Sequence, residues 1–184
     1  ILKSTHQMSL DCEFASGPNF SVIGYAYQCR VQSTTKVVSD FKFVDNINGV
    51  HHDVNSNAAC QMLWVWGTIF HYIPRGMGEH FTNLEAIWIH YGGLKELKNL
   101  EQFPNLRYIY ARHNQIEELP INTFKENPLM EWIDLRYNLI KFIDGDIFLA
   151  FGNLSNLNLR NNYCIDKVFN GKIKYPYEVS YFDF

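Results

Sequence analysis

Residues 106–116, which read LRYIYARHNQI, contain the pattern that decides the fold. Apolar residues stand at Leu106, Ile109, Ala111 and Ile116, and Asn114 comes two positions before the last of them. The same spacing recurs at 84–94 (LEAIWIHYGGL), 130–140 (MEWIDLRYNLI) and 154–164 (LSNLNLRNNYC). The four copies begin 22, 24 and 24 residues apart, and a fifth, CQMLWVWGTIF at 60–70, begins 24 residues before residue 84. Chance does not produce agreement at so many positions, so the chain is built from a repeated unit.

The repeated unit is similar to the leucine-rich repeat both in its pattern, L-x-x-L-x-L-x-x-N-x-L, and in its period. In each unit the alternate apolar residues predict a short strand with one face in the core, after which a turn carries the chain across the back. Side-chain amides at Asn114, Asn138 and Asn162 are expected to satisfy backbone groups that the bend leaves free. We therefore expect an α/β leucine-rich-repeat solenoid, a horseshoe arc whose concave side is a parallel sheet of about five repeats at 59–165.

The ends of the repeat array need covers, because a terminal repeat cannot bury its own apolar edge. Residues 1–58 do not fit the repeat, and the apolar segments 10–14 and 20–31 around a turn-rich stretch predict a capping β-hairpin. A Cys12–Cys29 disulfide that closes this hairpin is the expected pairing in a secreted chain. Residues 166–184 form a C-terminal tail or cap, whose aromatic end either packs on the last repeat or contacts a second copy. The whole is expected to be one continuous domain.

The other two cysteines stand at buried positions of the repeat. Cys60 aligns with Leu84, and Cys164 aligns with Leu94. About four repeats separate the two thiols, roughly 20 Å at a strand spacing of ~4.8 Å, and no disulfide spans that distance. We expect two buried free thiols. The alternative is an intermolecular disulfide through Cys164, near the C-terminal end.

Several short segments around the repeats carry a further resemblance. They are YQCRV at 27–31, GVH at 49–51 with Val54, IPRG at 73–76, FTNL at 81–84 and NYCIDK at 162–167. In these features the chain resembles the secreted leucine-rich-repeat proteins of insects. The resemblance implies extracellular recognition and no shared catalytic activity. In many of those proteins a later cysteine bonds the one that matches Cys164, and none follows it here, so the resemblance does not extend to a conventional C-terminal cap.

The outward-facing residues of the five predicted strands align into columns on the concave face. All four tryptophans fall in these columns, where they alternate with the core positions. An aromatic strip left in water usually marks an interface, and Trp, Tyr and Arg dominate binding energies. The alternative is that the protein's own tail or cap covers the strip. The residues expected to contact a partner or ligand are Trp64, Trp66, Trp88, His90, Tyr108, Tyr110, Arg112, Trp132, Arg136, Tyr137 and Arg160.

One column contains three successive arginines, Arg112, Arg136 and Arg160. Guanidinium groups about 5 Å apart repel one another unless carboxylates or stacked rings intervene. Asp134 and Glu131 are within reach and would neutralise them in an internal network. The alternative is a subsite for a carboxylate, sulfate or phosphate of a partner.

The composition excludes several classes of protein. An apolar fraction of 47% with 19% charged residues predicts a folded domain, and a net charge of −3 gives no electrostatic reason to bind nucleic acid. No apolar run approaches the roughly 20 residues that span a bilayer. Phosphate-binding and hydrolase motifs are missing, and adjacent histidines such as His51 and His52 point to opposite sides of a strand. We therefore expect no enzyme, no metal and no cofactor.

A secreted location is expected from the cysteines and from the first residue, Ile1, which suggests a processed terminus. The sequons at Asn19 and Asn153 permit N-glycosylation there.

Three functions are compatible with the concave face. The first is recognition of a protein partner or of a second copy, the second is binding of a glycan or a small apolar ligand on the tryptophans, and the third is a structural role in a secreted assembly. The shallow curve of five repeats favours protein recognition.

Overall fold

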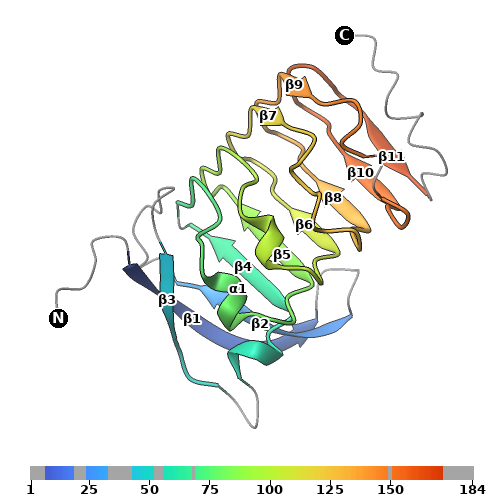
Figure 1. The fold of residues 1–184 in the computed structure, drawn as a ribbon. Helices are drawn as coiled ribbons and strands as arrows, with labels where there is room; N and C mark the ends of the chain where they lie inside the picture. The colour runs from blue at the N-terminus through green and yellow to red at the C-terminus, as the bar shows by residue number, and fades with distance from the viewer. Residues whose placement is uncertain are drawn as a thin grey trace.

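The computed structural model describes residues 7–18, 24–32, 43–51, 56–67, 69–148 and 151–171. A nine-stranded sheet dominates these residues, with the strand order β11-β10-β8-β6-β5-β4-β2-β1-β3. Figure 1 shows the strands of the sheet stacked from the blue N-terminal end to the orange C-terminal end, so the order in space follows the order in sequence almost throughout. The leucine-rich-repeat fold expected from the sequence is confirmed.

Five strands of this sheet come from the five repeats. Each pairs in parallel with the next, and the first residues of the five strands lie side by side in one row. The alignment of the repeats against each other therefore predicted the register of the sheet. The strands are β4 (Met62–Trp66), β5 (Ala86–His90), β6 (Tyr108–Tyr110), β8 (Trp132–Asp134) and β10 (Asn156–Asn158).

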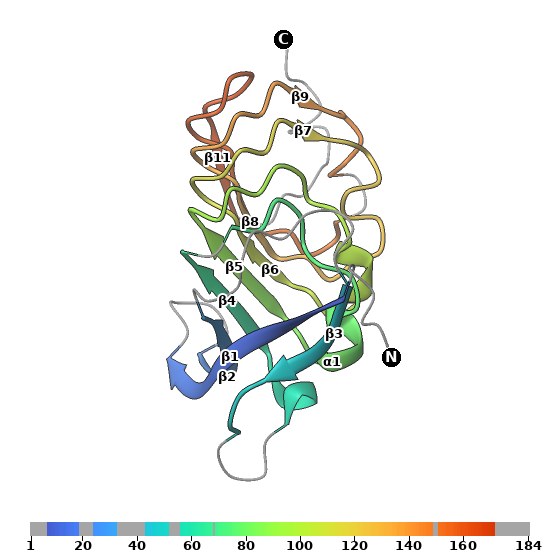
Figure 2. The same ribbon diagram turned by 90° about the vertical axis from the view of Figure 1, so that its left-hand side faces the viewer.

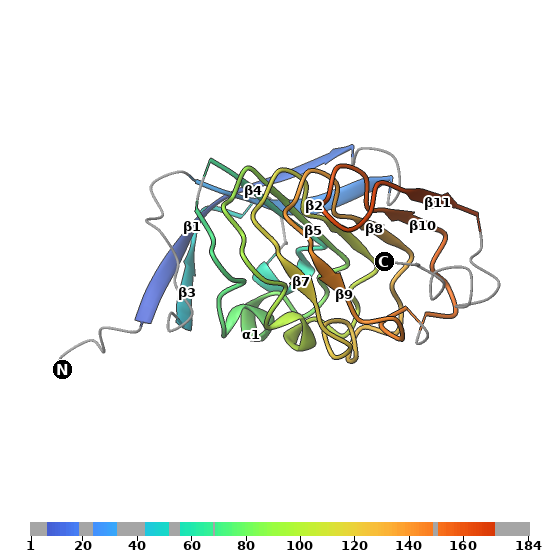
Figure 3. The same cartoon turned by 90° about the horizontal axis from the view of Figure 1, so that it is seen from above.

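A second, irregular layer covers the back of the sheet. It contains one helical turn α1 (Met77–His80), the 3-10 turns η1 (Asn57–Ala59) and η2 (Leu100–Gln102), and the parallel pair β7 (Glu118–Leu119) and β9 (Phe142–Ile143). Figures 2 and 3 show α1, β7 and β9 on one side of the large sheet. Four buried phenylalanines of the back segments, one per repeat, belong to the core that joins the two layers: Phe81, Phe103, Phe124 and Phe148.

The expected asparagine ladder holds successive repeats together. The Oδ1 atom of Asn114 accepts hydrogen bonds from the backbone N–H groups of Gly92 and Leu94, at 3.0 and 3.1 Å. One and two units later, Oδ1 of Asn138 and of Asn162 each accepts one such hydrogen bond, from the N–H groups of Ile116 and Ile140. The side-chain amide groups of both asparagines also donate to backbone carbonyls of the repeat before. Each amide thus satisfies backbone groups that the bend removes from the sheet.

The N-terminal region continues the sheet instead of only covering it. β1 (Gln7–Pro18) and β2 (Tyr25–Val31) form the expected antiparallel hairpin, and the Cys12–Cys29 disulfide joins them. β2 also pairs in parallel with β4, so the hairpin adds directly to the strands of the repeats. A further strand, β3 (Phe43–Asn48), lies parallel to β1 and was not expected from the sequence.

The C-terminal end of the array is covered by β11 (Val168–Asn170), which pairs antiparallel with β10. One expectation was that the tail covers this end by packing alone, but residues 172–184, with the aromatic stretch, lie outside the described residues.

Both remaining cysteines are free thiols: Cys60 is fully buried as expected, whereas Cys164 is only half-buried. An intermolecular disulfide through Cys164 stays a prediction.

Candidate binding face

The repeat strands separate two groups of apolar side chains. Leu63 and Ile87 belong to the main core, between the sheet and the back layer. Their neighbours in the chain form a second cluster, as expected from the alternation along a strand. This second cluster comprises Met62, Ala86, Trp88, Tyr108 and Tyr110, with Trp64 and Trp132 packed against it. The concave face is thus an aromatic surface, and all four tryptophans come from its strands.

The rings of the central column stack on one another along the array. Trp64 and Trp88 lie 4.7 Å apart and nearly parallel, and Trp88 and Tyr110 follow at 4.9 Å. As a result Trp88 and Tyr110 are only 7% and 8% exposed. Tyr108, beside this column, is 3% exposed, with the Arg107 guanidinium 5.2 Å from its ring centroid. The expectation of a broadly exposed strip was wrong for these three residues. Trp64 and Trp132 are half-buried.

A second aromatic ladder runs along the rim where the strands end, and we call Trp66, Tyr91, His113 and Tyr137 the rim ladder. The Tyr91 and His113 rings stack at 4.5 Å, His113 and Tyr137 stack at 4.4 Å, and Trp66 meets Tyr91 edge-on at 6.0 Å. Unlike the central column, this ladder is open to solvent: Trp66, Tyr91 and Tyr137 are 56%, 58% and 47% exposed.

Backbone conformation explains why the rim ladder is exposed. Gly67, Tyr91, His113, Tyr137 and Asn161 hold the same position in the five repeats, and all five have positive φ, between 53° and 72°. This left-handed conformation turns the chain out of the sheet, and it is unusual for residues with large side chains. Tyr91 and His113 were not among the expected contact residues, although Gly67 in the same column was a signal for the turn.

The arginine column is partly neutralised from within the face. Arg136 binds the buried Asp134 carboxylate through Nε and Nη2, the latter at 2.8 Å. Arg112 donates from Nε to Nε2 of His90 at 3.3 Å, and its Nε lies 3.8 Å from the same carboxylate. Among the described residues, the exposed side chain of Arg160 makes neither a hydrogen bond nor an ion pair. Asp134 therefore neutralises part of the arginine column, as expected for an internal network of charges.

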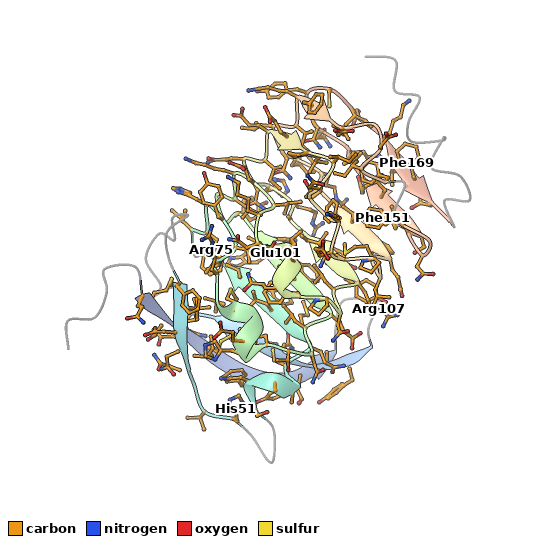
Figure 4. All side chains as sticks on the ribbon, in the orientation of Figure 1. His51, Arg75, Glu101, Arg107, Phe151 and Phe169 are labelled. Carbon is orange, nitrogen blue, oxygen red and sulfur yellow. A yellow bond between two sulfur atoms is a disulfide. The ribbon has the colours of Figure 1, made fainter. Side chains whose placement is uncertain are left out.

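Glu131 does not contribute to that neutralisation, contrary to the expectation. Its carboxylate binds Arg107 at 2.7 Å and accepts the Tyr108 hydroxyl at 2.7 Å, on the other flank of the face. Arg107, labelled in Figure 4, also binds Glu85, at 3.0 Å. Burial, together with the hydrogen bond to Glu131, raises the pKa of Tyr108 to about 12, so its hydroxyl remains a donor.

The two histidines of the face are held in the neutral form. Burial lowers the pKa of His90 to about 3, and the positive charge of Arg112 acts in the same direction. The hydrogen bond from Arg112 is consistent with this, because only a neutral imidazole can accept a hydrogen bond at Nε2. Burial and the same arginine also lower the pKa of His113.

Other chemistry is not assembled in the described part of the chain. Those residues include no group of three His, Cys, Asp or Glu side chains that would hold a metal. Burial raises the pKa of Cys60 to about 12, so this thiol stays protonated. His51 is held by Tyr27 and Asn57, at 2.7 and 2.9 Å, whereas His52 lies outside the described residues. None of the described helices is long and apolar enough to cross a membrane.

A surface hollow of about 840 Å³ lies away from the concave face, between loops that follow the strands. Its lining contains four glutamates, two lysines and few apolar side chains. Of the two sequons, Asn153 is exposed and Asn19 lies outside the described residues.

Sequence comparison finds relatives through the repeats. The family model described as leucine rich repeat matches residues 104–163. Leucine-rich repeat-containing G-protein coupled receptor 5 of Rattus norvegicus is 26% identical over 110 residues, which cover 60% of this chain and 12% of the receptor.

Two solved structures share the fold. The first, from the complex of Toll with Spatzle of Drosophila, has a TM-score of 0.53 at 15% identity and covers 69% of this chain and 17% of the matched one. The second, the leucine-rich repeat domain of APL1, has a TM-score of 0.50 at 14% identity and covers 84% and 43%. The chain thus spans less than half the length of each protein that it resembles.

Proposed function

We propose that this chain is an extracellular, non-enzymatic recognition module that binds a protein partner through its concave face and the rim ladder. The main support for the proposal is the exposed rim ladder, which runs beside the stacked rings of the central column. A rigid row of solvated aromatic rings next to arginines has the composition of an interaction hot spot.

Buried donors on the same face support a partner that adds hydrogen bonds. The Tyr110 hydroxyl and the Trp132 indole N–H are buried and have no hydrogen-bond partner in the described structure. Buried polar groups in folded proteins are nearly always paired, so a partner that shifts the neighbouring rings would give these two donors an acceptor. A backbone carbonyl of a bound protein segment, or a water at its edge, would supply one.

The stacking geometry favours a protein over a glycan. Sugar rings bind aromatic residues through the ring faces, but in both ladders the faces of the inner rings are covered by the next ring. What the rim ladder offers to solvent is therefore mainly ring edges. Edges suit the mixed apolar and carbonyl surface of a protein, because the edge of an aromatic ring carries partial positive charge.

The extracellular assignment rests on the cap and on the relatives. A disulfide closes the Cys12–Cys29 hairpin, and such bonds persist in oxidising compartments. The similar structure comes from a complex of Toll with Spatzle, and the sequence relative is named as a G-protein coupled receptor. The insect affinity and the use of the sequons remain part of the proposal.

Site-specific photo-crosslinking tests the proposal. A photoreactive phenylalanine analogue replaces Trp66, Tyr137 or Phe142 in turn, and the protein is irradiated with secretions and cell surfaces of its source tissue. Phe142 in β9 is the matched control, because it is an aromatic residue that is 53% exposed on the back layer. We expect positions 66 and 137 to link to one and the same protein and position 142 to link to none of it. Crosslinks to a partner protein from position 142 alone would contradict the proposal.

The mass of the crosslinked product also shows whether the partner is a second copy, since a complex of two copies has twice the mass of the chain. Replacing Trp66 with Ala should then weaken binding of the identified partner by about 2 kcal/mol, as is typical of an aromatic hot spot. The second candidate, a glycan or small apolar ligand, predicts instead a change of tryptophan fluorescence on a glycan or lipid panel in the absence of any protein.

A further inference from the structure

We propose that Arg112, Arg136 and Arg160 form a subsite for side-chain carboxylates, which takes an acidic segment of the protein partner. The inference rests on the proposed function, because it names the chemistry of the partner at that same face. It is carried by the charge of the face, by the way in which the arginines are held, and by the donors that remain free.

The concave face is positive although the molecule is not. The five repeat segments 62–67, 86–91, 108–113, 132–137 and 156–161 contain three arginines and one carboxylate, that of Asp134. His90 adds no charge, and the chain as a whole has a net charge of −3. These segments thus keep two positive charges beside aromatic rings, on the side away from the flank where Glu85 and Glu131 bind Arg107, and the local dielectric there is lower than in water. An anion gains more here than at an exposed lysine.

The guanidinium groups are oriented before any partner arrives. Asp134 holds Arg136 by two nitrogens, and His90 holds Arg112 by its Nε. The Arg112 guanidinium also lies 6.0 Å from the Trp88 ring centroid. The side chain of Arg136 is 33% exposed and that of Arg112 is 28% exposed, so both arginines are restrained but accessible to a partner. A fixed guanidinium loses little conformational entropy when it binds a carboxylate.

Several donors on these side chains are unused. Arg136 keeps Nη1, Arg112 keeps both Nη groups, and Arg160 keeps its whole guanidinium, within the ranges that the structure describes. The column stays in register beyond the strands, since His113 N–H donates to the Arg136 carbonyl and Tyr137 N–H to the Arg160 carbonyl. The three groups therefore form a row at strand spacing, ~5 Å per step. This step lies between the ~3.3 Å that separates successive residues of an extended segment and the ~7 Å that separates residues on the same side of it, so the long side chains of glutamates can reach neighbouring guanidinium groups.

A short acidic peptide segment fits this row better than a sulfated polysaccharide. The row spans only three repeats, and the molecule around it has a net negative charge. A long polyanion would place most of its charges against that surface. The neighbouring rim ladder also offers aromatic contacts that the apolar side chains of a peptide would use.

Fluorescence anisotropy of a labelled hexaglutamate peptide at low salt tests the subsite. We expect binding that weakens as salt is added, and a loss of about fivefold or more in Arg160→Gln and in Arg112→Gln. Asp134→Asn should tighten binding, because it removes the competing carboxylate. Lys125→Gln, which changes the net charge as much as the arginine variants do but lies in an exposed back segment, should stay within about twofold of the wild type. Arg136→Gln is avoided, because it would leave buried Asp134 without its partner.

The result overturns the inference if hexaglutamate does not bind, or if Lys125→Gln weakens it as much as Arg160→Gln does. A sulfated hexasaccharide that binds more tightly than the peptide, and loses affinity in Arg160→Gln, would also overturn the choice of a peptide. Failure of this inference is distinguishable from failure of the proposed function. Crosslinks from positions 66 and 137 test protein recognition without any arginine, whereas the peptide titration tests the arginines without any partner.

Discussion

His90 shows how one side chain is fixed by its neighbours on the concave face. It accepts a hydrogen bond from Arg112 and lies 4.9 Å from the Trp88 ring. The hydrogen bond needs a neutral imidazole, because a protonated Nε2 cannot accept, and burial lowers the pKa of His90 to about 3. The sequence predicted His90 as a contact residue, but the rings beside it decide how deeply it is buried. Its role is to hold Arg112 rather than to titrate near neutral pH.

The depressed pKa of His90 predicts a loss of stability in acid. The unfolded imidazole takes up a proton near its ordinary pKa of 6.5, whereas the folded one does so only near pH 3. Stability from this group is therefore complete above pH 6.5 and is lost as the pH falls towards 3, by about 3 kcal/mol between pH 7 and pH 4. Urea unfolding at several pH values measures this slope.

His90→Gln provides the comparison, since glutamine can also accept a hydrogen bond from Arg112 but does not titrate. Its free energy of unfolding should fall less steeply between pH 7 and pH 4 than that of the wild type. Equal slopes in the two proteins would show that His90 is not the group responsible.

At the scale of elements, the ends of the repeat strands share one conformation. One position after β4 and β5, and three positions after β6, β8 and β10, the chain enters the left-handed region, with φ of 53° at Tyr91 and 57° at Tyr137. Only Gly67 among the five equivalent residues is a glycine. Stacking of Tyr91, His113 and Tyr137 accompanies this conformation in the repeats where a side chain must adopt it. The left-handed turn thus costs backbone free energy and also presents the rings of the proposed binding surface.

Substitutions of Tyr137 can separate the backbone cost of the left-handed conformation from the contribution of the stacked ring. Tyr137→Ala and Tyr137→Gly both remove the ring, but only alanine must still adopt a φ of 57° with a Cβ. We expect the glycine variant to be more stable than the alanine variant by about 1 kcal/mol in urea unfolding.

Lys125 is the control for this comparison, because it lies in an exposed turn and is not among the residues with positive φ. There the order should reverse, with Lys125→Ala more stable than Lys125→Gly, since glycine loses more backbone freedom on folding. The same order at both positions would contradict the role assigned to the left-handed turn.

At the scale of the molecule, one sheet connects the cap to the last repeat. β2 pairs with β4 on one side and with β1 on the other, so the disulfide-bonded hairpin is an extension of the repeat array. Repeat arrays unfold cooperatively when the interfaces between neighbouring units are strong. We therefore expect the cap to share the stability of the repeats.

Removal of the disulfide tests this continuity. Cys12→Ser combined with Cys29→Ser opens a loop of 17 residues and should lower the free energy of unfolding by about 3 kcal/mol. The urea transitions followed by tryptophan fluorescence and by far-UV circular dichroism should shift together. Cys164→Ser, at a half-buried free thiol, should shift them by much less. A separate early change in circular dichroism alone would show that the cap unfolds independently.

The sequence by itself determined the repeats, the five parallel strands and their register, the asparagine ladder, the Cys12–Cys29 bond and the side of the sheet on which all tryptophans lie. These features follow from local periodicity, because alternation along a strand and a constant repeat length fix which residues become neighbours. Only the tertiary structure decided which of those residues are reachable. Stacking covers Trp88 and Tyr110 and leaves the rim ladder exposed, and Tyr108 is also buried. Glu131 binds Arg107 instead of the arginine column. The additional strands β3 and β11 also depend on pairing between distant segments, which no repeat pattern records. Ring packing and ion pairing depend on side-chain conformations in three dimensions, and the spacing of residues in a sequence does not specify them.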